Sequence, residues 1–320
     1  MKKPFKNKYL RFTFRLLCCA SAAVATVTPA QSWTPTKNVE IVVSSAPGGS
    51  NDKTGRSVEK MLNDLKLVPT SVTVNNKPGG GGNIAYAYMN THGGDGHYLL
   101  VGTTALLSNH IVGSSKLNYN DFTPIASLFN DYVVFAVYAG SAMKSGKDLV
   151  GRLKSSPQSV PVGFATTLGS HNHIAAGLLI KAAGGNARDL KPVAFKGSSE
   201  AVAALLGSHL ELVTTAAGNV AGHVQAGKLR ALGVSSEKRL PGVFSLAPTW
   251  KDQGVNLVYG GWRSIFGPKN LPAPQVAYWE NVLRKAAASA EWKAELERNY
   301  WSDDFVTSAQ FRKEIGRAHV

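Results

Sequence analysis

The sequence predicts an α/β protein with two mainly parallel sheets and helices on their faces. Short apolar runs rich in β-branched residues alternate along the chain with segments whose apolar residues recur at helical spacing. Glycine-rich turns join several of these strand-like runs to the helix-like segments that follow them. About 290 residues remain after an N-terminal signal, which is enough for one large or two modest domains.

The first 30 residues have the pattern of a secretory signal peptide. Six lysines and arginines precede an uncharged stretch over 16–30. The small residues Thr28 and Ala30 suit cleavage before Gln31, and a cut after Ser32 is the alternative. At about 15 residues, the stretch is shorter than the roughly 20 that a bilayer crossing needs. We therefore expect an exported protein whose signal peptide is cleaved near Ala30.

Cysteine and charge restrict the class of protein further. Cys18 and Cys19 are the two cysteines of the sequence and lie inside the predicted signal, where the preceding leucines suit lipid attachment poorly. The mature chain is thus expected to depend on its hydrophobic core, without disulfides. Of the net charge of +15, residues 1–30 contribute six positive and no negative charges, which leaves +9. The remaining basic residues are scattered and lack interleaved aromatics, so nucleic acid is not an expected partner.

The first element after the signal is a strand over 39–45, followed by a glycine-rich turn over 46–52 and a helix that includes Val58, Met61 and Leu62. The first N–H groups of a helix have no partner within it, and the helix dipole adds partial positive charge there. Such a turn can bind a carboxylate or phosphate, and glycine allows close approach to the backbone. An ordinary loop is the alternative.

The same arrangement recurs twice in the next sixty residues. A strand over 72–74 leads into four glycines at 79–82 and a helix with Ile84, Tyr86 and Met89. A buried strand over 97–103 then ends in Thr103 and Thr104. Since ligands of open α/β sheets bind beyond the carboxyl ends of the strands, we expect these three strand ends to meet in one crevice.

A second domain is predicted after a strand over 131–137. It begins with the segment 145–153 and alternates strands at 160–164, 191–195, 210–215 and 230–234 with helices at 173–183, 198–206 and 219–226. A strand over 259–266 is expected to return to the first domain. Helices over 272–289 and 290–298 then close the chain, with Trp279, Leu283 and Leu296 facing inward. Residues 315–320 end a helix-like segment in mid-course and are assigned no role.

Two turns of the second domain also connect a strand to a helix start. Residues 169–172, Gly-Ser-His-Asn, form a third candidate anion site, and residues 196–200 form a fourth, in which Ser198 is alternatively an N-cap. Two domains that direct helix N-termini at one cleft would form a clamp that closes by a hinge.

Motifs for other chemistries are incomplete. The glycines at 79–82 lack the third glycine of a dinucleotide fingerprint, and Leu229 replaces the Ser or Thr of a P-loop. Ser50 to Gly55 resembles β-lactamase motifs only superficially, and no G-x-S-x-G elbow occurs. His171 and His173 diverge on a helix or a strand and suit ligand contact or capping better than a metal. No cofactor, metal or catalytic residue is predicted.

The sequence resembles the extracytoplasmic solute receptors of tripartite tricarboxylate transporters, the Bug receptors, over roughly 33–304. The markers, in chain order, are Pro47-Gly48-Gly49 with Asp52, Asn76-Lys77-Pro78-Gly79-Gly80-Gly81-Gly82, Gly169-Ser170-His171-Asn172-His173, Leu205-Leu206-Gly207 and Ala226-Gly227-Lys228-Leu229-Arg230-Ala231-Leu232. Each marker is weak alone, but their order is specific.

The resemblance implies a type II periplasmic binding protein with two lobes around a ligand cleft. Lobe 1 would comprise 31–138 and 259–320, and lobe 2 would comprise 139–258. Substrate-binding residues follow by match to the family: Gly49, Ser50, Asn51, Gly81, Gly82, Asn83, Thr103 and Thr104 on lobe 1, and Ser170, His171 and Ser198 on lobe 2.

Three further features resemble the tricarboxylate-receptor branch. Thr215 stands where many family members have an aspartate, and the other two features are the segments Ser108-Asn109-His110-Ile111 and Trp262-Arg263-Ser264. Arg263 could bind a ligand carboxylate with two hydrogen bonds, or equally form a surface or interlobe salt bridge. Asp52 is expected to order its turn rather than to contact an anion.

These observations predict a non-catalytic, monomeric receptor that captures a small carboxylate, a di- or tricarboxylate such as citrate, and delivers it to the integral-membrane permease subunits of a tripartite transporter. The alternative is a secreted hydrolase of a small anionic substrate that uses Ser50 or Ser170 with His171. A third possibility is a receptor that signals through a different membrane partner.

Overall fold

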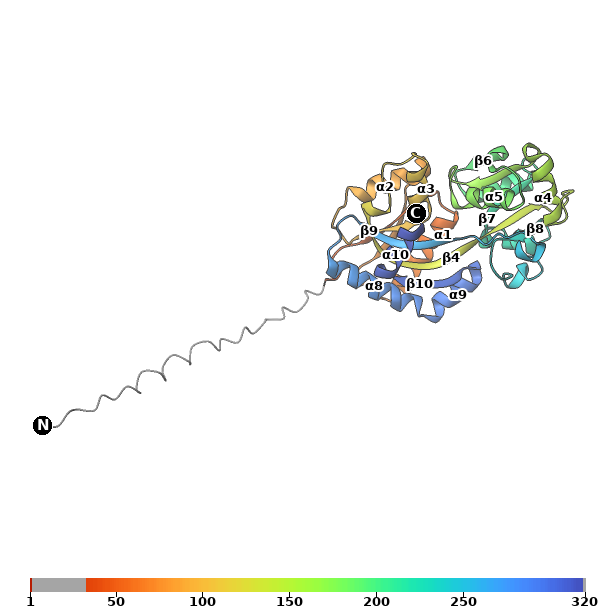
Figure 1. Ribbon diagram of the computed structural model, residues 1–320. Coiled ribbons are helices and arrows are strands. Elements are labelled where there is room, and N and C mark those ends of the chain that lie inside the picture. Colours follow the sequence, from red (N-terminus) through yellow and green to blue (C-terminus); the bar gives the residue numbers. More distant parts are fainter. Residues whose placement is uncertain (2–32, 319–320) are drawn as a thin grey trace. The chain divides into compact units, whose positions relative to one another are not determined.

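The computed structural model describes Met1 and residues 33–318, and the chain from Trp33 onward forms one compact unit (Figure 1). The predicted signal peptide and its cleavage position lie outside the described residues. Among the residues that are described, no helix combines the length and apolar character that a bilayer crossing requires.

The first sheet combines strands from both ends of this unit. β1 (Val39–Val43) lies between β2 (Val72–Asn76) and β3 (Tyr98–Gly102) and is parallel to both. β9 (Gly260–Pro268) pairs antiparallel with β3 on one side and with β4 (Phe122–Tyr138) on the other. β10 (Ser302–Thr307) also pairs antiparallel with β4. The sheet is therefore mixed, not mainly parallel as the sequence predicts.

The second sheet has a parallel and an antiparallel half. β5 (Pro161–Ala165) lies between β6 (Lys191–Phe195) and β7 (Leu212–Ala216) and is parallel to both. β7 and β8 (Leu229–Val234) each pair antiparallel with β4.

The long strand β4 belongs to both sheets. Its residues 122–132 pair with β9, and residues 133–138 pair with β7 and β8. Figure 1 shows the strand passing from one group of elements to the other. Lobe 1 below denotes the part built on the first sheet, and lobe 2 the part built on the second. The lobe boundaries at 138/139 and 258/259 stay a prediction.

Helices cover both faces of the first sheet. α1 (Ser50–Asp64), α8 (Ala273–Ala287) and α9 (Ala290–Asn299) pack on one face together with Ile41. α2 (Asn83–Asn90), α3 (Ala105–Ile111) and α10 (Ser308–Ala318) pack on the other together with Val42. Neighbouring strand residues thus serve opposite cores. The prediction that Trp279, Leu283 and Leu296 face inward is confirmed, since all three are buried.

The second sheet is covered in the same way. α4 (Gly146–Ser155) and α5 (His171–Ala182) share a core with Val133 and Phe135 of β4. α6 (Ser198–Leu206) and α7 (Ala217–Gln225) share the opposite core with Val134. Both lobes are therefore three-layered, and β4 supplies side chains to the cores of each.

Two strand segments were not predicted. The strand expected over 131–137 begins nine residues earlier, at Phe122, because Pro124 and the polar Thr123 and Ser127 disguise its first half. β10 carries Asp303 and Asp304, which disfavour strands in isolation. Ile315, to which no role was assigned, is buried in the core beneath α10.

Candidate functional site

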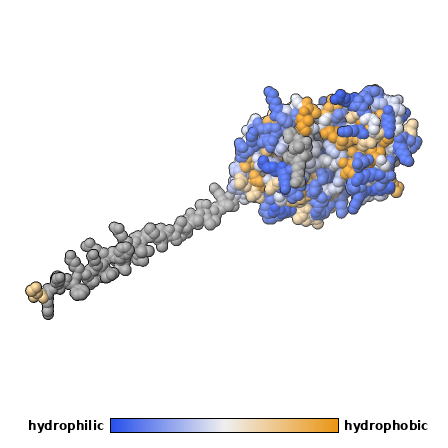
Figure 2. Space-filling view, viewed as in Figure 1, coloured by the Kyte–Doolittle hydropathy of each residue, from blue (hydrophilic) through white to orange (hydrophobic). Residues whose placement is uncertain are grey.

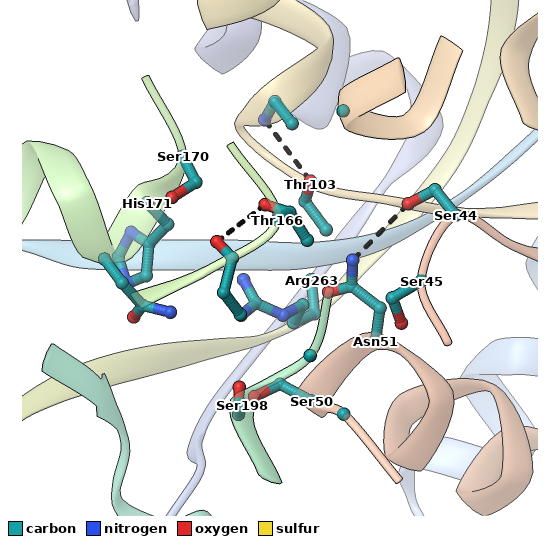
Figure 3. Close-up of a pocket in the computed structure, with 16 residues that line it drawn as sticks. Ser44, Ser45, Ser50, Asn51, Thr103, Thr166, Ser170, His171, Ser198 and Arg263 are labelled. Carbon is teal, nitrogen blue, oxygen red and sulfur yellow. Dashed lines mark hydrogen bonds between the residues drawn. The ribbon is translucent and has the colours of Figure 1, made fainter. Parts of the chain in front are cut away.

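A cavity lies where the two lobes meet (Figure 3). Its empty space, counted together with the solvent at its mouth, is about 540 Å³. In Figure 3 Arg263 lies between His171 on one side and Asn51 on the other. Sixteen residues line it: Ser44, Ser45, Gly49, Ser50, Asn51, Gly81, Thr103, Ala105, Ala165, Thr166, Ser170, His171, Asn172, Gly197, Ser198 and Arg263.

The first glycine-rich turn places the N-terminus of α1 at the cavity. Gly49 is the N-cap residue and makes no side-chain cap hydrogen bond, so the first amides of α1 have no side-chain acceptor at this position. Ser50 and Asn51 follow as the first helical residues and line the cavity. The helix N-terminus that the sequence predicts after the glycine-rich turn over 46–52 therefore forms one wall of the cavity.

Asp52 orders this turn from behind. Its carboxylate accepts hydrogen bonds from Gly48 N at 2.9 Å, Arg56 Nε at 3.0 Å and Asn76 Nδ2 at 2.8 Å. Burial alone would raise the pKa of Asp52, but the Gly48, Asn76 and Arg56 hydrogen bonds hold it below its ordinary value. Asp52 does not line the cavity, as expected of a residue that stabilises the turn.

The second glycine-rich turn contributes one of its residues to the cavity. Gly79 to Gly82 all have positive φ, between 56° and 121°, which side-chain-bearing residues adopt rarely. Asn109 Nδ2 donates to the Gly81 carbonyl at 2.9 Å and holds Gly81 at the cavity.

Three predicted ligand residues lie outside the cavity lining, namely Gly82, Asn83 and Thr104. Gly82 packs on Tyr86, where an added Cβ would lie 2.9 Å from the phenol oxygen. Asn83 Nδ2 donates to the Ser114 carbonyl at 2.7 Å and so fastens the following loop. At the end of β3 the lining residues are Thr103 and Ala105, on either side of Thr104.

Lobe 2 presents two more helix starts. Ser170 is the N-cap residue of α5, is 5 % exposed, and its Oγ has no hydrogen-bond partner in the described part of the chain. Gly197 is the N-cap of α6, so Ser198 is the first helical residue and not the N-cap. Neither helix start has a side-chain cap hydrogen bond. By contrast, α4 begins with a complete capping box from Ser145 and Asp148.

His171 joins α5 to the strands that connect the lobes. Its Nε2 lies 3.1 Å from the Asp131 carbonyl, which can only accept, so Nε2 carries the proton. The ring stacks on Tyr259 at 4.7 Å between centroids and packs on Gly261, where a Cβ would lie 2.5 Å from Nδ1. Burial, followed by the Arg263 charge, lowers the pKa of His171 to about 3. The imidazole is therefore neutral at physiological pH.

Arg263 forms an ion pair inside the protein. Its Nη2 lies 2.9 Å from Asp131 Oδ2, and both side chains are at least 95 % buried. Burial raises the pKa of Asp131 to about 6, while the charges of Arg263 and Lys53 act in the opposite direction. The sequence left open a surface or interlobe salt bridge, but this pair is buried and joins two strands of the first sheet. Arg263 also lines the cavity, so that its contact with a ligand carboxylate stays a prediction.

Three hydrogen bonds join the lobes beside the cavity. Asn219 Nδ2 donates to Ser50 Oγ at 2.8 Å, Ser199 Oγ donates to the Gly48 carbonyl at 3.2 Å, and Lys53 Nζ donates to the Gly218 carbonyl at 3.3 Å. All three bring the N-terminal part of α1 against lobe 2. The lobes are thus in contact along this edge of the cavity.

Several residues that line the cavity were not among the predicted ligand-binding residues. Ser44 and Ser45 follow Val43 at the end of β1, and the strand-end rule could have identified them. Thr166 has φ of 74°, a conformation that the residue type does not reveal. Asn172 and Gly197 lie in turns that the sequence did single out.

Metal binding and hydrolysis are the alternative chemistries for these residues. No group of three or more His, Cys, Asp or Glu side chains among the described residues could hold a metal ion. Ser50 Oγ is engaged by Asn219, and no hydrogen bond from Ser50 or Ser170 to a histidine is present in this part of the chain. The arrangement instead offers helix-terminal amides and hydroxyl groups around a small cavity.

Comparison with known proteins decides the family. The family model described as the tripartite tricarboxylate transporter family receptor, TctC, matches residues 56–315. The chain belongs to this family. It is therefore a periplasmic solute-binding receptor. Among its relatives, BugT of Bordetella pertussis is 27% identical over 275 residues, which are 84% of this chain and 82% of BugT.

Solved structures agree with the receptor fold. A TctC solute-binding protein from Polaromonas is 27% identical, with a TM-score of 0.65 over 89% of this chain and 96% of that one. Two R. palustris structures are each 22% identical and share the fold over 89% of this chain. Rpa4515 with adipate has a TM-score of 0.80 over 94% of its own chain, and MatC with bound malate has 0.76 over 98%. The two-lobed α/β fold is therefore confirmed.

Proposed function

We propose that this receptor binds a small di- or tricarboxylate, such as citrate, in the cavity between the lobes and delivers it to the permease of a tripartite transporter. The observation that carries the proposal is the convergence of three helix starts, those of α1, α5 and α6, on one cavity, each without a side-chain cap. Helix N-termini favour carboxylates through their unpaired amides and dipoles.

The charge arrangement supports recognition by amides and hydroxyls. Arg263 is the one charged side chain among the lining residues that the structure describes, and Asp131 already pairs with it. Ser50, Ser170 and Ser198 add hydroxyl groups from both lobes. The structures of the same fold that contain adipate and malate support the same ligand class. On this proposal the receptor is monomeric and exported, with cleavage near Ala30, and carries out no catalysis.

Gly197 offers a direct test of the cavity. It lines the cavity in extended conformation (φ −152°), and an added Cβ would meet nothing within 4 Å. Gly197→Leu should therefore fold normally and fill the site. Gly151→Leu on α4 is the matched control, because its Cβ also meets nothing and Gly151 does not line the cavity.

The measurement is calorimetry on refolded, ligand-stripped protein with citrate, malate, succinate and acetate. We expect saturable one-to-one binding of a di- or tricarboxylate, loss of that binding in Gly197→Leu, and retention in Gly151→Leu. If wild type binds none of these acids, the proposed ligand class is wrong. If Gly197→Leu binds as wild type does, the ligand occupies another site.

A further inference from the structure

An apolar groove lies beside the cavity and takes no part in the proposed ligand site. Its walls come from both lobes: Val112 and Ser114 follow α3 of lobe 1, while Thr167, Leu168 and the α5 residue Ile174 belong to lobe 2. The groove encloses about 1320 Å³, including the solvent at its mouth. We call it the seam groove.

Large apolar side chains are exposed along the seam groove. Of the lining residues, Val112 and Leu168 are 60% and 55% exposed, although residues of this kind are usually buried. Ile111, which precedes Val112 in the chain, is 63% exposed. Single exposed apolar residues are ordinary, but a cluster on a concave surface indicates an interaction site. Figure 2 shows apolar areas of this kind on an otherwise largely hydrophilic surface.

The two walls touch each other across the seam. A Cβ placed on Gly169 of lobe 2 would lie 3.9 Å from Val112 Cγ1, and one on Gly81 of lobe 1 would lie 2.9 Å from Thr167 Cγ2. The continuous groove therefore requires the lobe arrangement of this structure. A receptor whose lobes had separated would present two half-grooves instead.

One basic residue lines the seam groove, and three more lie within two residues of a lining residue in the sequence. Lys181 lines it, Arg188 and Lys191 each follow a lining residue, and Lys116 is two residues from Ser114. All four are exposed, and none forms a salt bridge within the described part of the chain. Asp189 is the one acidic residue in 181–191. A complementary partner thus combines an apolar side chain with carboxylates.

We propose that the seam groove docks a periplasmic loop of the membrane permease, a protein segment in which an apolar side chain is flanked by carboxylates. The inference rests on the proposed function, since it names the surface through which the receptor delivers its ligand. A concave apolar groove suits an inserted side chain, whereas an anionic lipid surface would supply charge without one. Because both lobes form the walls, docking selects receptors with closed lobes.

Variants in the groove test the proposal in the native host, from which the wild-type gene has been deleted. Val112→Asp and Leu168→Asp place a charge in the apolar groove, and the double variant Lys181→Glu/Arg188→Glu reverses the charge of its rim. Leu246→Asp and Lys285→Glu are the controls, because Leu246 is 88% exposed and both positions lie outside the groove. Each variant is assayed for uptake of the labelled carboxylate that calorimetry identifies and for affinity in solution.

We expect the groove variants to reduce uptake by about tenfold or more, as a charge does at an interface hot spot, with solution affinity unchanged. The controls should transport as wild type. A photocrosslinking residue at position 168 should link the ligand-saturated receptor to an integral-membrane protein through a segment containing Asp or Glu. Normal uptake by the groove variants would overturn the proposal. So would crosslinking to lipid, or binding to phosphatidylglycerol vesicles that lack permease. If wild type binds no carboxylate, the proposed function fails instead.

Discussion

The two walls of the cavity are built differently. In lobe 1, Asp52 satisfies the turn before α1 with three hydrogen bonds and lies outside the cavity. In lobe 2, Ser170 Oγ and His171 Nδ1 are buried without hydrogen-bond partners among the described residues, and Thr166 adopts a positive φ. The turn before α1 is thus stabilised from behind, whereas the lobe 2 wall contains two buried polar atoms without partners and a residue with positive φ. On the lobe 1 side, Arg263 Nε of β9 is likewise buried without a partner among the described residues.

This difference assigns separate roles to the walls. A turn that hydrogen bonds hold from behind, like the one before α1, can keep its amides in place before the ligand arrives, which reduces the ordering cost of binding. Buried polar groups without partners and strained residues cluster at binding sites, where a ligand can satisfy them. We expect substitutions on the lobe 1 side to affect stability most, and those on the lobe 2 side to affect ligand affinity most.

Asp131→Ala should have the largest effect, because Asp131 lies on β4 where the walls meet. The substitution leaves Arg263 buried without its carboxylate, and we expect the free energy of unfolding to fall by about 3–5 kcal/mol. Urea denaturation measures the loss. The double variant Asp131→Ala/Arg263→Met should recover part of it, and a loss under about 1 kcal/mol in Asp131→Ala would show that the pair is not buried as described.

Asp52→Ala sharpens the comparison between lobes, with Asp148→Ala as its counterpart. Both carboxylates lie in the first turn of a helix, but Asp52 is 3% exposed whereas Asp148 is on the surface at α4. We expect Asp52→Ala to cost about 1–3 kcal/mol of unfolding free energy by leaving buried donors unpaired, and Asp148→Ala about 1 kcal/mol or less. If urea denaturation gave the same loss of unfolding free energy for both variants, Asp52 would stabilise its helix start no more than Asp148 does.

Ser170→Ala tests the lobe 2 wall. Since Ser170 Oγ has no hydrogen-bond partner among the described residues, the free energy of unfolding should change little. Calorimetry with the bound acid should show weaker affinity by about 0.5–1.5 kcal/mol, the net contribution of one hydrogen bond. A stability loss with unchanged affinity would indicate that Ser170 supports the fold and not the ligand.

His171→Gln should have the smallest effect, visible in acid. The unfolded chain binds the imidazole proton below pH 6.5 and the folded protein only near pH 3, so the folded state loses stability as the pH falls through this window. Asp131, whose pKa is raised to about 6, acts with the opposite sign between pH 3.8 and 6. Urea midpoints at pH 7.5, 5.5 and 4.5 should fall less steeply in His171→Gln than in wild type.

The exposed His209→Gln is the control for this pH series, and its profile should match that of wild type. A wild-type profile for His171→Gln as well would mean that the imidazole is not held neutral in the fold. In that case the hydrogen bond from His171 Nε2 to the Asp131 carbonyl would not be what fixes the ring in its neutral form with the proton on Nε2.

Sequence patterns predicted the elements whose local signals are strong. The turn at Gly48 and Gly49, the glycines at 79–82 and the helix starts at Ser170 and Ser198 stand out because positive φ and helix termini need particular residues. The family resemblance, based on the order of these turns, was confirmed by the family model.

Features that depend on tertiary pairing could not be predicted. The first half of β4, with Pro124, becomes a strand because β9 and β10 lie on either side of it, and the acidic β10 becomes a strand because it pairs with β4. The directions of Asn83 and Thr104 depend on which neighbours pack around them, so a motif match could not show that they lie outside the cavity lining. The Asp131–Arg263 pair joins residues 132 positions apart.

The position of β9 in the first sheet has a consequence for the order of folding during synthesis. β9 lies between β3 and β4, yet it is made after every strand of the second sheet. The second sheet has all its strands once residue 234 has emerged, whereas the first must wait for residue 268 to fill its centre. The sheet of lobe 2 can therefore form while the sheet of lobe 1 still lacks β9. The cavity is complete only after β9 has been made, because Arg263 of β9 lines it.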